Sequence, residues 1–118
     1  MNNSANRGGA DNVNHPNHYE KSCSLECIEV MYLVFGKKAV FNFCLCNSFK
    51  YMWRYKNKNG EEDLNKAEWY LNHVHNSICG ISASKRDVVE KEAMEKCLEL
   101  ERLLFSLKHK SRGEKVED

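Results

Sequence analysis

Apolar side chains recur at helical spacing through most of this chain, and glycines interrupt that pattern at three places. The interruptions fall at Gly36, Asn59-Gly60 and Gly80, where helices can end because glycine and asparagine tolerate positive φ. No segment keeps the alternating period of a strand. The pattern predicts helices at about 24–35, 38–56, 61–80 and from 84 onward. We therefore expect an all-α fold, a compact bundle of about four helices with a disordered N-terminal arm.

The chain is expected to divide into four segments. Residues 1–12 lack apolar periodicity and are predicted to be disordered, and residues 13–80 form the helical core domain. Residues 81–110 form a packing or self-association helix that opens with a capping-box pattern at 84–87, and residues 111–118 form a charged tail. A chain of 118 residues is also small enough that a homo-oligomer is expected.

The second predicted helix is apolar on more than one side, which indicates a central position. Its core stripe is expected at Phe41, Leu45, Phe49 and Met52, and Trp53 widens that stripe. We expect all of these side chains to be buried.

Composition excludes several classes of function. The formal net charge is only +1, which argues against a protein that coats duplex DNA by charge. No apolar run approaches the roughly 20 residues that a membrane span needs, and the first residues lack the apolar region of a signal peptide. The expected location is cytoplasmic.

The six cysteines are expected to be reduced thiols rather than a disulfide framework. An alternative is a zinc site made by Cys23 and Cys27 with His15 and His18. The spacing is loose and contains no CxxC pair, so small buried side chains are the favoured interpretation. We expect no resident metal, and zinc at this cluster stays the alternative.

One face of the second predicted helix is polar and cationic. It carries Asn47, Lys50, Tyr51 and Arg54 at positions i, i+3, i+4 and i+7, so the four lie on one side. Lys58 lies one turn further and could extend the face. Such a face suits a phosphorylated ligand.

The third predicted helix repeats this spacing with Asp63, Lys66, Ala67 and Tyr70. Helices joined by a short turn normally lie antiparallel, so the two polar stripes could face each other. The alternative is structural: Asp63 caps its helix, and Lys66 pairs with Glu62 at i+4.

An arm precedes the helices and holds a second set of candidate ligand groups. Pro16 pushes His15 towards an extended conformation, and His18 and Tyr19 follow. Imidazole can donate, accept or stack, so the arm could form one wall of a binding site. Equally, it could pack Tyr19 onto the bundle and leave both histidines in solvent.

Three segments together resemble the SaV-like family of small phage and prophage proteins. They are VNHPNHY at 13–19, LECIEVM at 25–31 and NSFKYMWRYKNKNGEEDLNKAEWYL at 47–71. One podoviral member of that family is described as a nucleotide kinase that lacks a Walker motif and phosphorylates deoxynucleoside monophosphates. The resemblance implies a phage or prophage origin and a nucleotide as the partner. For a phage-encoded chain, the expected cytoplasm is that of the host cell. This chain departs from the family at Cys46, where glycine is common.

In the kinase hypothesis, Lys50 and Arg54 neutralise phosphate charge, since phosphoryl transfer depends mostly on positioning and electrostatics. Asp63 holds Mg²⁺ or accepts the substrate proton, so Mg²⁺ is a cofactor only in this case. The expected substrate-binding residues are His15, His18, Tyr19, Asn47, Lys50, Tyr51, Arg54, Lys58, Lys66 and Tyr70. One alternative is a protein that sequesters a nucleotide signal without turnover and so blunts host defence. Another is a module that binds a host protein through its last helix.

Overall fold

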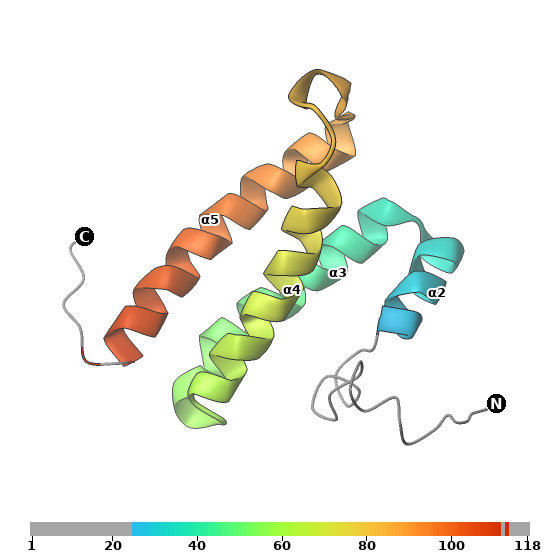
Figure 1. The fold of residues 1–118 in the computed structure, drawn as a ribbon. Coiled ribbons are helices and arrows are strands. Elements are labelled where there is room, and N and C mark those ends of the chain that lie inside the picture. Colours follow the sequence, from blue (N-terminus) through green and yellow to red (C-terminus); the bar gives the residue numbers. More distant parts are fainter. Residues whose placement is uncertain (1–24, 112, 114–118) are drawn as a thin grey trace, which may run out of the picture. The chain divides into compact units, whose positions relative to one another are not determined.

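The computed structural model describes residues 25–111 and 113 (Figure 1). The chain divides into two units, residues 1–36 and 37–118, and each is described by itself. The described part contains four α-helices and no strand, which confirms the all-α prediction. No helix in this part is long and apolar enough to cross a membrane. The arm and the segment predicted to be disordered lie outside the described residues.

Helix α2 spans Leu25–Phe35 and carries Glu26 in its first turn, where the helix dipole favours negative charge. Gly36 ends the helix as predicted. Its φ is 86°, a value that glycine adopts without the strain other residues would meet. Its N–H donates to the carbonyl of Tyr32 at 3.0 Å.

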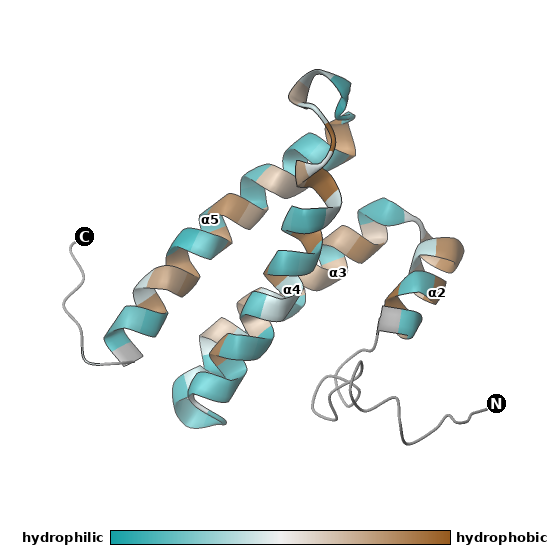
Figure 2. Cartoon of the chain, viewed as in Figure 1, coloured by the Kyte–Doolittle hydropathy of each residue, from teal (hydrophilic) through white to brown (hydrophobic). Residues whose placement is uncertain are grey.

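The second unit is built from three helices. Helix α3 spans Lys37–Arg54, α4 spans Glu61–Cys79 and α5 spans Val88–Ser111, with short 3₁₀ turns at Tyr55–Asn57 and Ala83–Lys85. Each of the three helices contacts the other two. Figure 2 shows hydrophilic and hydrophobic residues alternating along α4 and α5, the pattern of helices with one face in a core.

The core of this unit lies among the three helices. Fully buried side chains include Val40 of α3, Leu64 and Leu71 of α4, and Cys97 of α5. Burying a leucine contributes about 1.5–3 kcal/mol, so these contacts provide the main stabilisation of the unit.

The predicted core stripe of α3 was wrong at two positions. Trp53 is 79% exposed and Phe49 is also exposed, whereas Ser48 is fully buried and donates its hydroxyl hydrogen bond to the carbonyl of Ala67 at 3.1 Å. A serine opposite an alanine lets α3 and α4 approach closely, because neither side chain occupies much space. That approach turns Phe49 and Trp53 out of the interface.

The start of α5 also differs from the prediction. The capping box forms at Asp87 and Glu90, three residues later than expected: the Glu90 N–H donates to Asp87 at 2.8 Å and the Asp87 N–H donates to Glu90 at 3.0 Å. The Nζ of Lys37, at the start of α3, binds both carboxylates and lies 2.9 Å from Glu90. This cluster ties the start of α3 to the start of α5.

We predict that Lys37→Met makes stability less sensitive to acid. Hydrogen bonds from Lys37 hold the pKa of Asp87 and Glu90 below their ordinary values of 3.8 and 4.5. A carboxylate whose pKa is lower in the folded protein than in the unfolded chain stabilises the fold at pH values above its unfolded pKa. That contribution is lost as the pH falls through its folded pKa. Urea unfolding between pH 6 and pH 3 should therefore show a steeper loss for the native chain than for the variant. Lys38→Met, at the neighbouring exposed lysine, should keep the native slope; equal slopes in all three proteins would contradict the prediction.

Candidate functional site

Three cations gather around the ring of Tyr51 near the end of α3. The Cζ of Arg54 lies 4.8 Å from the ring centroid, and the Nζ atoms of Lys50 and Lys66 lie 5.4 and 5.7 Å from it. Cations within about 6 Å of an aromatic ring are attracted by its quadrupole. The ring therefore offsets part of the repulsion among positive charges that come from two helices.

Packing fixes the position of the Tyr51 ring. Tyr51 is 7% exposed and stacks on Tyr70 of α4, with centroids 6.0 Å apart and planes at 15°. Tyr70 is itself buried and meets Phe43 and Trp69 edge to face. Because both tyrosines are buried, their contribution to the site is to hold the cations in place.

Asp63 anchors Arg54 from the first turn of α4. Its side chain is fully buried, and its Oδ2 lies 3.5 Å from the Nε of Arg54. The backbone N–H and the side-chain amide of Asn59 donate to Asp63 at 3.3 and 3.4 Å. Arg54 Nε has no hydrogen-bond acceptor among the described residues, so its contact with Asp63 is electrostatic.

A tight turn brings these residues together. Gly60 takes a φ of 62°, and its N–H donates to the carbonyl of Tyr55 at 2.8 Å. This reversal places the start of α4 beside the end of α3. Asn59-Gly60 is therefore both the predicted turn and the element that sets Asp63 against Arg54.

Lys50, Arg54 and Lys66 around Tyr51 form a cation cluster, in which positive charge exceeds negative charge. Lys66 lies 4.0 Å from Glu62, the predicted i, i+4 partner, and Asp63 faces Arg54. Lys50 is exposed and has no ion-pair partner in the described part of the chain. Three cations thus face two carboxylates, which leaves the site suited to an anion.

The other residues predicted to bind the ligand lie on α3, in the turn after α3, or outside the described part of the chain. Asn47 is half-buried on α3, one turn before Lys50, and Lys58 is exposed in the turn after the 3₁₀ segment. His15, His18 and Tyr19 lie outside the described residues, so their predicted role as a wall stays a prediction. Of the four residues considered as an alternative zinc cluster, only Cys27 is described. It is exposed on α2, so the favoured interpretation of a small buried side chain was wrong at this position.

Sequence reasoning missed two residues here. Asn59 was assigned only to the turn, although it supplies both hydrogen bonds to Asp63. Trp53 was assigned to the core, although it is exposed at i+3 from Lys50. Its helical position, between the buried stripe and the polar stripe, was the available signal.

A model of the family described as a protein of unknown function, DUF3310, matches residues 13–72. The chain belongs to the DUF3310 family. The DUF3310 match includes α2, α3 and the first two-thirds of α4, and so contains every residue of the cation cluster. Helix α5 lies beyond it. The comparisons with curated proteins and with solved structures gave no match.

We predict that Asp63→Asn destabilises the protein by about 1–3 kcal/mol, because it leaves Arg54 without its counter-charge and weakens the acceptor for Asn59. Urea unfolding at neutral pH measures the loss. Glu61→Gln removes a carboxylate from the same helical turn at an exposed position and should change stability by no more than about 0.5 kcal/mol. If both variants lost the same free energy of unfolding, the carboxylate of Asp63 would stabilise the protein only through the helix dipole.

Proposed function

We propose that this chain is a nucleotide-binding protein whose cation cluster holds the phosphate. The observation that carries the proposal is the convergence of Lys50, Arg54 and Lys66 around the buried ring of Tyr51. Phosphate accepts charge-assisted hydrogen bonds from lysine and arginine, which are among the strongest polar contacts in proteins. An anion here would relieve the mutual repulsion that the cluster otherwise carries.

Trp53 is the aromatic surface on which we propose that the base stacks. It is 79% exposed and lies three residues after Lys50, on the adjoining part of the α3 surface. Phe49 supports it, with ring centroids 5.9 Å apart. Stacking on an exposed aromatic side chain contributes about 1–3 kcal/mol per base.

The resemblance of segment 47–71 to SaV-like proteins supports a phage or prophage origin and a nucleotide as ligand. The resemblance implies one mode of action, and the cationic and aromatic character of the site allows a second. A kinase would transfer phosphate to a deoxynucleoside monophosphate with Mg²⁺ bound through the phosphates. A sequestering protein would hold a nucleotide signal without turnover and so protect a phage from host defence.

The environment of Asp63 favours sequestration. Its carboxylate is fully buried and already engaged by Asn59 and Arg54, so as placed it has no exposed oxygen for Mg²⁺ or a substrate proton. In a kinase, Asp63 would act as a positioning residue for Arg54, and Lys50 and Arg54 would supply the charge stabilisation.

We predict that Lys50→Ala and Arg54→Ala each weaken nucleotide binding at least tenfold, a loss of about 1.4 kcal/mol or more, because each removes a cation from the phosphate. Calorimetry with deoxynucleoside mono- and triphosphates, with and without Mg²⁺, measures the affinity. Lys91→Ala, at an exposed lysine of α5, is the matched control and should bind as the native chain does.

Incubation with ATP, Mg²⁺ and each deoxynucleoside monophosphate separates the two modes. Diphosphate product would establish the kinase, and tight binding without product would establish sequestration. If no nucleotide bound and Arg54→Ala stayed folded and unchanged, both modes would be refuted, and binding of a host protein would take their place.

A further inference from the structure

A histidine, a cysteine and a carboxylate meet where α4 packs against α5. The Nδ1 of His75 lies 3.0 Å from one carboxylate oxygen of Glu101 and 3.3 Å from the other. The Sγ of Cys97 lies 3.7 Å from Oε2 of Glu101, the oxygen that is closer to His75. One ligand atom from each residue falls within 4.8 Å of the other two.

Helical geometry produces this grouping. Cys97 and Glu101 are four residues apart on α5 and so share one face. His75 is four residues after Leu71 on α4, and the Cys97 thiol donates to the Leu71 carbonyl at 3.4 Å. The cysteine thus lies in the core, while the other two side chains reach the edge of the interface.

The separations suit a tetrahedral ion. Zinc binds thiolate at about 2.3 Å, imidazole nitrogen at about 2.0–2.1 Å and carboxylate oxygen at about 2.0–2.2 Å. A tetrahedron with those bonds holds its ligand atoms roughly 3.3–3.7 Å apart. The observed separations bracket this range, so small rotations of the side chains would complete the site.

We propose that His75, Cys97 and Glu101 bind a divalent transition-metal ion of the zinc class. Thiolate with imidazole favours zinc over magnesium or calcium, which prefer oxygen ligands. Three protein ligands leave the fourth position of the tetrahedron to water or to another small ligand. The side chains of His75 and Glu101 are 36% and 29% exposed, so an ion can enter from solvent.

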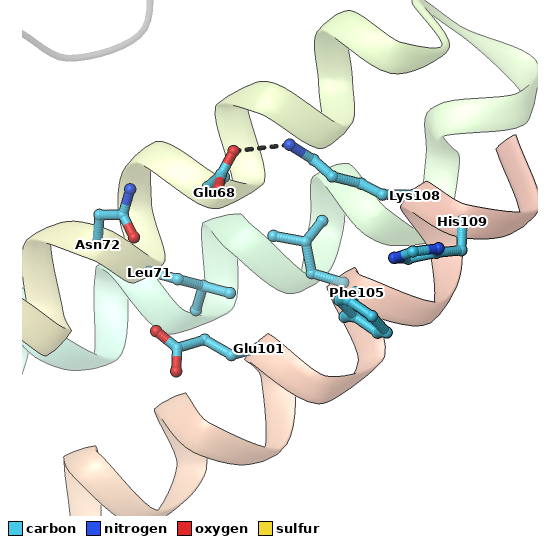
Figure 3. Close-up of a pocket in the computed structure, with 8 residues that line it drawn as sticks. Glu68, Leu71, Asn72, Glu101, Phe105, Lys108 and His109 are labelled. Carbon is cyan, nitrogen blue, oxygen red and sulfur yellow. Dashed lines mark hydrogen bonds and ion pairs between the residues drawn. The ribbon is translucent and has the colours of Figure 1, made fainter. Parts of the chain in front are cut away.

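A cavity lies beside Glu101, the one proposed ligand that lines it. It has a volume of about 310 Å³ and lies between α4 and α5. Figure 3 shows Glu101 and Asn72 towards one end of the cavity, and the ion pair of Glu68 with Lys108 towards the other. On its Glu101 side, the proposed metal position would therefore lie next to a hollow with polar groups at both ends.

Binding has a defined proton balance. Burial and the neighbouring Glu101 raise the pKa of the Cys97 thiol to about 12, so the metal-free thiol is protonated at neutral pH. The ion displaces that proton into solvent as the Sγ–metal bond forms. In the contact with Glu101 the His75 Nδ1 carries a hydrogen, because a carboxylate only accepts. The neutral imidazole binds the ion through Nδ1 once that hydrogen has moved to Nε2 by exchange with solvent, which changes no charge. A bond from each residue to the metal then replaces their mutual contact, and three ligands link α4 to α5.

This site is separate from the proposed nucleotide site. All three ligands lie beyond residues 13–72, the part that matches the family model. His75 lies on the side of α4 that faces α5, where it contacts Glu101. Lys66 and Tyr70 lie on the side of α4 that faces the Tyr51 ring of α3. Metal binding can therefore be tested without any nucleotide.

The test is a titration of the full, metal-stripped chain with Zn²⁺ and with Co²⁺. We expect one ion per chain, a thiolate-to-cobalt charge-transfer band and a rise in Tm on zinc addition, because a ligand that binds only the folded state stabilises it. His75→Ala and Glu101→Gln should each weaken binding at least tenfold, and Cys97→Ser should abolish the charge-transfer band. Cys79→Ser, at an exposed cysteine of α4 outside the cluster, should behave as the native chain.

A Cys23→Ser/Cys27→Ser double variant separates this site from the zinc cluster considered for the N-terminal segment. It should bind as the native chain does. The proposal is overturned if the native chain binds no ion, or if the double variant loses the ion while His75→Ala keeps it. Should Cys97→Ser fail to fold, His75→Ala and Glu101→Gln still decide the matter, since both change partly exposed side chains; native affinity in both would refute the site.

Discussion

The buried carboxylate of Asp63 is the constraint on which the arrangement of the candidate nucleotide site depends. A charge removed from water must be paired or hydrogen-bonded, because an isolated buried ion costs several kcal/mol. Asp63 meets that requirement through Asn59 on one side and Arg54 on the other. Satisfying one buried group thereby fixes the turn, the approach of α4 to α3 and the position of the guanidinium beside Tyr51.

The cation cluster balances opposing terms. Like charges this close repel, and the repulsion grows where the surroundings are poorly hydrated. The electron-rich face of Tyr51 and the carboxylates of Glu62 and Asp63 offset part of it. Lys50 stays uncompensated by any described carboxylate, so the remaining imbalance is located on the exposed side of the cluster. In the proposed nucleotide site, an anion would meet exposed Lys50 before the less exposed Arg54.

Local rules predicted the features that depend on neighbouring residues. The helices and their ends at Gly36 and Gly60 follow from spacing and from backbone freedom, and the polar stripe of α3 follows from helix geometry alone. Ser48 and Phe49 show where such rules fail. Hydrophobicity assigns phenylalanine to the core, but the close contact of Ser48 with Ala67 decides which face is buried, and that contact joins residues nineteen apart.

The sequence analysis predicted neither the observed start of α5 nor the grouping of His75, Cys97 and Glu101, and the reason is the same for both. Two overlapping capping patterns precede α5, and Lys37, fifty residues away, contacts the one that forms. His75 and Glu101 are separated by twenty-six residues, a spacing that matches no metal motif. Only the packing of α5 against α4 makes them neighbours.

Helix α5 lies outside the segment that matches the family, yet it contacts α4 beside the cation cluster. The Nζ of Lys108 binds Asn65 at 3.1 Å and Glu68 at 2.6 Å, and these two residues flank Lys66 on α4. Further along the same interface, Cys97 and Glu101 contact Leu71 and His75. Helix α5 therefore holds α4 at two places, and the first of them supports the segment that presents Lys66 to Tyr51. The cations around Tyr51 thus come from α3 and α4, and part of the packing that supports them comes from a helix that contributes no cation to the cluster.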